Sequence, residues 1–117
     1  MLSNFSFSDS TVGFVIDKEY TKEVSKQLHK RILEKAEVYD KINLYIEDSS
    51  IEHFSIKIVA KEIIFKLENA SLFNKVALVS DRKWIHRCAS VENMFMEAEV
   101  KSFDSDDRLS AISWIAS

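Results

Sequence analysis

The spacing of apolar residues changes along this 117-residue chain, from every second residue to every third or fourth and back again. Ile42, Leu44 and Ile46 alternate with Asn43 and Tyr45, as the residues of a half-buried β-strand do. Other segments carry apolar residues at helical spacing, with charged residues on the remaining positions. The alternation of the two periods predicts an α/β fold.

Five segments have the period of strands and four have that of helices. The strands are predicted at residues 5–7, 12–16, 42–47, 76–79 and 98–103. The helices are predicted at residues 21–36 and 55–69, from residue 82, and after residues 104–105. The first two strands should form an antiparallel hairpin, and Thr21 and Ser55 are the expected helix caps.

Strands that are joined by helices run parallel, with right-handed crossovers. A doubly wound sheet would need strands that are apolar on both faces, but residues 42–47 and 98–103 alternate. We therefore expect a single-wound, mostly parallel five-stranded sheet in the order β-β-α-β-α-β-α-β-α, with the helices mainly on one face. Residues 76–79 do not alternate, so this strand should lie near the centre of the sheet. The last helix should turn Leu109, Ile112 and Ile115 inward.

Charge and cysteine content exclude several classes of protein. The 16 basic and 19 acidic residues give a net charge of −3, which argues against a nucleic-acid partner. Cys88 is the only cysteine, so no internal disulfide forms, and no cluster has the spacing of a metal site. We expect no signal peptide and no membrane-spanning helix. The prediction is one cytoplasmic domain over residues 1–117, without a metal or cofactor.

The segment VALVSDRKWI at residues 76–85 resembles a stretch of the SpoIIAA-like family in which a strand is followed by Ser-Asp, a basic pair and Trp. The likeness continues in AEVKSFD at 98–104 and AISWI at 111–115. This family belongs to the wider STAS fold of sulfate transporters and anti-sigma-factor antagonists. The resemblance implies a single-wound sheet, shared with lipid-carrying CRAL-TRIO domains, and a non-enzymatic binding or regulatory role. It also implies that apolar ligands or membrane surfaces are suitable partners.

The antagonists of this fold carry an Asp-Ser-Ser-Gly motif at the start of their second long helix, and a kinase phosphorylates its first serine. Here Asp48, Ser49 and Ser50 are followed by Ile51 instead of glycine, several residues before the expected helix. The phosphorylation switch is therefore not carried over to this chain.

In open α/β sheets, ligands gather at the carboxyl ends of the strands, next to the helix N-termini. The loops at 17–21, 47–55, 80–84 and 104–105 should converge there. The candidate loop-edge site consists of Asp48, Ser49, His53, Asp81, Lys83 and Trp84. The alternative is that residues such as Asp81 and Asp104 only cap helices.

This loop edge does not have the features of an active site. His53, Asp48 and a nearby serine are the residue types of a hydrolytic triad, but no nucleophile elbow and no glycine-rich turn accompany them. We therefore predict no catalytic residue. Cys88 is expected in the core, and His86 is expected to face water.

The helix at 55–69 is apolar on two sides. Its expected core stripe consists of Ile56, Val59, Ala60, Ile63 and Leu67. Ile58 and Phe65 would then share the outer face, beside Lys57 and Lys61. Such a helix contacts a second helix, a second copy of the chain or another protein, or else it lies on a lipid surface with its lysines at the rim. Met94 and Met96 would line an apolar pocket or fill a gap.

Two functional hypotheses follow. The first is a module that binds an apolar ligand or associates peripherally with a membrane through the surface of Ile58, Phe65, Lys57, Lys61, Met94 and Met96. The second is a protein-interaction or signalling module that acts as a homodimer or through the loop edge.

Overall fold

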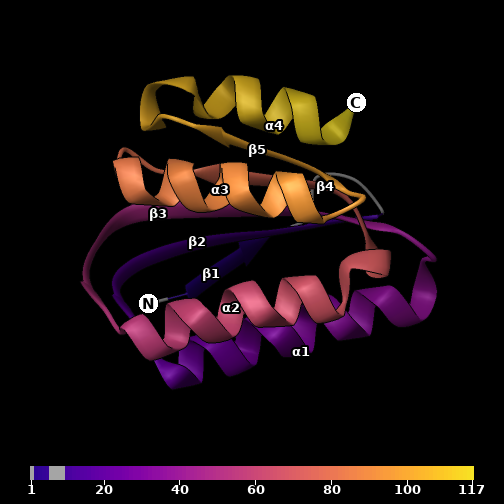
Figure 1. Cartoon of the computed structure of the whole chain (residues 1–117), viewed down its shortest axis with the longest axis horizontal. Coiled ribbons are helices and arrows are strands. Elements are labelled where there is room, and N and C mark those ends of the chain that lie inside the picture. The colour runs from indigo at the N-terminus through magenta and orange to yellow at the C-terminus, as the bar shows by residue number, and fades with distance from the viewer. Residues whose placement is uncertain (1, 6–9) are drawn as a thin grey trace.

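The computed structural model describes residues 2–5 and 10–117, which form one sheet flanked by helices (Figure 1). The strands are β1 (Leu2–Phe5), β2 (Thr11–Tyr20), β3 (Ile42–Phe54), β4 (Phe73–Val79) and β5 (Glu99–Phe103). The helices are α1 (Lys22–Val38), α2 (Ile56–Glu68), α3 (Lys83–Phe95) and α4 (Arg108–Ala116). Short 3-10 turns at Ala70–Leu72 and Ser105–Asp107 precede β4 and α4.

The order of the strands in the sheet is the order in the chain, β1 to β5. Four strands, β2 to β5, are mutually parallel, and β1 is added antiparallel at the edge, with Leu2 opposite Ile16. Each helical crossover thus moves one strand further in the same direction, as the sequence predicts. The expected central position of residues 76–79 is wrong, because β3 is the middle strand and β4 lies one place from the edge. Phe7 is outside the described residues.

Helices cover both faces of the sheet, but unequally. The main core packs α1, α2 and α3 against one face, with side chains such as Leu28, Ile32 and Ala89. A smaller core holds α4 on the other face, where Ala111 and Ile115 meet the sheet. Figure 1 shows α4 across the strands from α1 and α2. The expectation of helices mainly on one face is thus met by α1, α2 and α3, and α4 is the exception.

The position of α4 follows from the strands that it covers. Tyr45, Ala77 and Val79 are apolar residues on the second face of β3 and β4, and exposing them to water would cost free energy. β4 does not alternate because both of its faces are buried. The expected inward position of Leu109 is wrong: it is 76% exposed, and Ala111 and Ile115 are the fully buried residues.

Helix α1 has the predicted cap and the predicted core face. The backbone N–H of Val24 donates to Thr21 Oγ1 at 3.3 Å, which supplies a partner at the open helix start. Leu28 and Ile32 are fully buried, four residues apart on one side of the helix.

Helix α2 is rotated relative to the expected orientation. Ile58 and Phe65, expected on the outer face, pack against the main core. Glu62 and Lys66 are buried beside them. The expected core residues Ala60 and Leu67 are exposed, as are Lys57 and Lys61, and the side chain of Ile56 lies outside the described part of the chain. The rotation is possible because both buried charged groups have polar partners on neighbouring helices.

The predicted loop at 47–55 is mostly strand. β2 and β3 remain paired as far as Tyr20 and Phe54, beyond the point where β4 ends. The pairing gives hydrogen-bond partners to the backbone N–H and C=O groups of this extension. The register of the two strands shifts near Lys18 and Ser50, whose φ angles are 61° and 62°. Asp48 therefore lies in a continuous strand, just past the pairing of Glu47 with Val79.

Candidate binding site

A cavity of about 90 Å³ opens between α2, α3 and the carboxyl ends of β2, β3 and β4. Its lining is mainly apolar and includes Ile46, Leu78, Val59, Ile63 and Ile85. The space is far larger than one water needs, but smaller than the apolar cavity of about 150 Å³ that holds benzene in another protein. It can therefore enclose the end of an alkyl chain or part of a ring system, and the remainder of a larger apolar molecule would lie in its opening.

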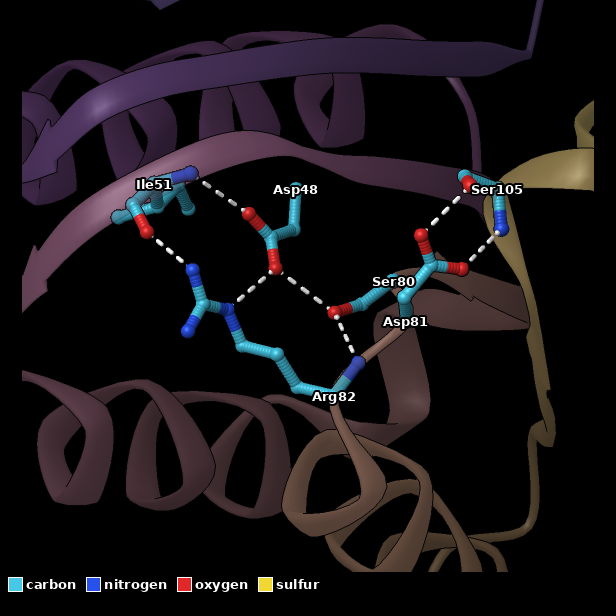
Figure 2. Close-up of polar contacts among 6 residues, drawn as sticks. All are labelled: Asp48, Ile51, Ser80, Asp81, Arg82 and Ser105. Carbon is cyan, nitrogen blue, oxygen red and sulfur yellow. Dashed lines mark hydrogen bonds and ion pairs between the residues drawn. The ribbon is translucent and has the colours of Figure 1, made fainter.

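Asp48 lines this cavity and is the centre of a hydrogen-bond network, which Figure 2 shows. Asp48 Oδ1 accepts a hydrogen bond from the Ile51 amide at 2.9 Å. Asp48 Oδ2 accepts from Ser80 Oγ at 2.7 Å and from Arg82 Nε at 2.8 Å. Arg82 also donates to the Ile51 carbonyl, and its backbone N–H donates to Ser80 Oγ at 3.1 Å. The network fixes the start of α3 against β3.

Aromatic rings lie next to this network. The Arg82 guanidinium carbon is 4.9 Å from the centre of the Phe54 ring, and Trp84 meets the same ring edge-on at 4.9 Å. Stacking on aromatic faces is a property of guanidinium that lysine does not share to the same degree. The side chains of Phe54 and Trp84 also line the cavity, so the network and the apolar wall are parts of one structure.

Asp81 points toward the β5–α4 connection, where it contacts Ser105 (Figure 2). Its two carboxylate oxygens accept from the Ser105 amide at 2.8 Å and from Ser105 Oγ at 2.7 Å. These hydrogen bonds lower the pKa of Asp81. Asp81 therefore holds two loops together and does not cap α3, whose N-cap residue is Arg82.

The other candidates of the loop edge are dispersed. Asp48 and Trp84 line the cavity, whereas Ser49, His53 and Lys83 are not among the described residues that do. His53 and Lys83 are exposed. The dispersal follows from the continuation of β3, because successive side chains of a strand point to opposite faces.

Charged residues inside the helical layer are the part of the site that sequence reasoning missed. Glu62 Oε1 accepts from Ser25 Oγ at 2.5 Å and lies 2.9 Å from His29 Nε2. Lys66 Nζ lies 3.0 Å from Glu92 Oε1. The available signal is the four-residue spacing of Glu62 and Lys66, which places both charged residues on one side of α2.

The surroundings of these groups shift their pKa values. Burial alone would raise the pKa of Glu62, but the hydrogen bonds from His29 and Ser25 outweigh it and hold the pKa below its usual value. Burial, and then the charge of Glu62, raise the pKa of the Tyr20 hydroxyl, which therefore stays neutral. Burial and the nearby Glu92 carboxylate also raise the pKa of the Cys88 thiol.

His86 does not face open water as expected. Its Nδ1 lies 2.6 Å from Ser102 Oγ and its Nε2 lies 3.0 Å from Asp104 Oδ1. The contacts attach α3 to β5 and to the loop that follows it.

The outer surface of α2 and α3 carries exposed apolar side chains. Those on α3 are Met94, Phe95 and Val91, of which Met94 and Phe95 are 76% and 71% exposed, and those on α2 are Ile64 and Leu67. We call these five residues the α2–α3 face. Met96, expected on the same surface, is buried in the main core, where it fills space between α3 and β5.

Within residues 2–5 and 10–117, no group of three or more His, Cys, Asp or Glu residues could hold a metal ion. No helix in this part of the chain has both the length and the apolar character to cross a bilayer.

Comparison with known proteins gives a consistent assignment. None of the curated proteins matches the chain. A solved structure with a similar fold is that of an uncharacterized protein of the DUF3478 family, with a SpoIIAA-like fold, from Shewanella loihica PV-4. The two share 21% sequence identity with a TM-score of 0.71, over 98% of this chain and 92% of the other. The model of the SpoIIAA-like family matches residues 11–116, and the chain belongs to that family.

Proposed function

We propose that this protein is a non-enzymatic binding or regulatory module that receives an apolar ligand in the cavity between α2, α3 and the sheet. The supporting observation is the apolar lining of that cavity at the carboxyl ends of the parallel strands. Ligands of open α/β sheets collect at this end, and binding pockets are mostly apolar with a few placed polar groups. The resemblance to the SpoIIAA-like family also implies a sheet like that of lipid-carrying CRAL-TRIO domains, and we include this kinship in the proposal.

The α2–α3 face gives the ligand a route to the cavity from a membrane surface. Its apolar residues share the two helices with the exposed cations Lys57, Lys61, Lys83 and Arg87. Apolar anchors beside basic residues are the composition of surfaces that lie on anionic bilayers. A peripheral encounter with the bilayer would let an alkyl chain pass between α2 and α3 without crossing water.

Binding of a neutral apolar fluorophore, N-phenyl-1-naphthylamine, tests the cavity. Ile63 lines it, whereas its neighbour Ile64 is exposed, so the two residues form a matched pair on one helix. Ile63→Trp should fill the space and weaken probe binding at least ten-fold, and Ile64→Trp should leave it nearly unchanged. Urea unfolding shows that both variants are folded. A wild type that does not bind the probe, or an Ile63→Trp variant that binds it normally, contradicts the proposal.

Co-sedimentation with vesicles tests the membrane encounter separately. The wild type should pellet with vesicles of equal parts phosphatidylcholine and phosphatidylglycerol, and much less with phosphatidylcholine alone. Phe95→Asp should abolish pelleting, and Leu109→Asp, an equally exposed position on α4, should not. Pelleting that survives Phe95→Asp removes the α2–α3 face from the proposal.

Self-association is the second candidate function, and the same five exposed residues favour it, because large apolar side chains at a surface often contact another protein. Sedimentation equilibrium distinguishes it from the membrane role. A dimer that Phe95→Asp converts to a monomer supports self-association, and a wild-type monomer at all concentrations excludes it.

A further inference from the structure

The Tyr20 hydroxyl interacts with the Glu62 carboxylate, but no described residue gives Oε2 of that carboxylate a hydrogen bond of good geometry. Its Oε1 is occupied by Ser25 and His29, but Oε2 is buried without a hydrogen-bond partner. The residue is only 7% exposed, so a partner for Oε2 has to come from within the cavity. A buried oxygen in this condition costs free energy comparable to a lost hydrogen bond, and such groups in native proteins are few. Because Glu62 lines the cavity, a ligand there can supply the missing donor.

The charges around the cavity decide what kind of donor fits. Three carboxylates line it, those of Asp48, Glu62 and Glu92, against a single ammonium group, that of Lys66. Lys66 is already paired with Glu92 at 3.0 Å, and Asp48 accepts three hydrogen bonds from protein groups. Among the described lining residues, carboxylates therefore outnumber cations. The carboxylate without an ammonium or guanidinium partner is that of Glu62, which Ser25 and the His29 imidazole contact from outside the lining. A carboxylate ligand would be repelled, and a cation would be attracted.

We propose that the ligand is an alkyl amine in its protonated form, whose ammonium group donates to Glu62 Oε2 while its alkyl chain lies along Ile63 and Ile85. This assignment rests on the proposed function above and specifies the class of ligand. Charge-assisted hydrogen bonds to a carboxylate are about twice as strong as neutral ones. An ammonium also has three N–H donors, so it can satisfy Oε2 and still reach the neutral Tyr20 hydroxyl, another residue of the lining.

Competition against bound N-phenyl-1-naphthylamine measures the preference. The competitors are n-hexylamine, n-hexanol and hexanoate at neutral pH, where an alkyl amine, like the lysine side chain with its pKa of about 10.4, is protonated. Hexylamine should displace the probe at a concentration at least ten-fold lower than hexanoate, with hexanol between them. Glu62→Gln should remove the preference while the probe still binds, and Glu68→Gln, an exposed position on the same helix, should keep it.

A second comparison needs only the wild type, so it holds even if Glu62→Gln fails to fold. Hexyltrimethylammonium keeps the charge of hexylamine but has no N–H donor, so calorimetry should show binding at least ten-fold weaker. Equal binding of the two cations overturns the hydrogen bond to Oε2. Displacement by hexanoate as effective as that by hexylamine overturns the charge preference. If the probe binds with no preference among competitors, only this inference fails, whereas the absence of binding by both probe and amine removes the proposed function as well.

Discussion

Lys66 on α2 and Glu92 on α3 form an ion pair in the interior, with 3.0 Å between Lys66 Nζ and Glu92 Oε1 and side chains only 6% and 2% exposed. Both residues also line the cavity. The pair therefore joins the two helices between which the ligand would enter. Any movement that opens α2 and α3 would have to stretch or break it.

Removal of one partner of this pair should be more damaging than removal of both. Glu92→Ala leaves the Lys66 ammonium buried without a counter-ion, and losses of this kind are about 3–5 kcal/mol in the free energy of unfolding. Lys66→Met combined with Glu92→Leu replaces both charges with apolar groups and should restore stability to within about 1 kcal/mol of the wild type, or exceed it. Urea unfolding followed by circular dichroism measures both. Glu97→Ala, at an exposed position, is the control. If the single and double variants lose the same free energy of unfolding, the prediction is wrong.

The second prediction concerns Asp48 and its three hydrogen-bond donors. Asp48→Ala leaves the Arg82 guanidinium, Ser80 and the Ile51 amide without their acceptor, and we expect a loss of about 2–4 kcal/mol. The specific readout is the Ile51 amide, whose hydrogen exchange should accelerate strongly. Asp106→Ala, an exposed change, should alter neither quantity. Unchanged protection of the Ile51 amide in Asp48→Ala would show that the network does not hold this part of β3.

Periodicity predicted that α2 exists, but not which side faces the core. A sequence argument assigns charged residues to the surface, and on that rule Glu62 and Lys66 turn Ile58 and Phe65 outward. In the fold, Ser25 and His29 on α1 contact Glu62, and Glu92 on α3 pairs with Lys66. Each partner is 26 or more positions along the chain from the charged residue that it contacts, so no local pattern could reveal it. The polar half of the site was hidden for the same reason.

The sheet shows the same division between local and distant causes. The alternation of residues 42–47 and the family likeness were sufficient to predict parallel strands that are added in one direction. The local residues Asp48, Ser49 and Ser50 are typical of a turn, but pairing with the end of β2 keeps them in a strand. The place of α4 depended on Tyr45, Ala77 and Val79, which leave a second apolar face to cover.

The third prediction concerns pH and Glu62. Its folded-state pKa is lower than the value of about 4.3 for an unperturbed glutamate, so its contribution to stability is complete above that pH. The contribution disappears as the pH falls from about 4.3 through the folded-state pKa. The unfolding free energy of the wild type should thus fall more steeply with acid than that of Glu62→Gln, and Glu68→Gln should behave like the wild type. Urea midpoints between about pH 6 and pH 3 test this, and parallel curves for wild type and Glu62→Gln would contradict it.

The fourth prediction tests the orientation of α4 with two residues of similar size. Ile115 is fully buried against the second face of the sheet, and Leu109 is 76% exposed. Ile115→Ala should lower the free energy of unfolding by about 2–5 kcal/mol, because it removes packed methyl groups and leaves a cavity. Leu109→Ala should change it by no more than about 0.5 kcal/mol. The opposite ranking would place Leu109 inward, as the sequence alone indicated.

The fifth prediction uses Cys88, the only cysteine of the chain, as a reporter inside the cavity. Burial and the Glu92 carboxylate raise the pKa of its thiol, and the thiolate is the species that reacts. At about pH 8, alkylation by iodoacetamide should therefore be at least ten-fold slower in the folded protein than in urea. Because Cys88 lines the same cavity, saturating N-phenyl-1-naphthylamine should slow the reaction further, as followed by the mass of the intact chain. A rate that the probe leaves unchanged would mean that the probe binds somewhere other than between α2 and α3.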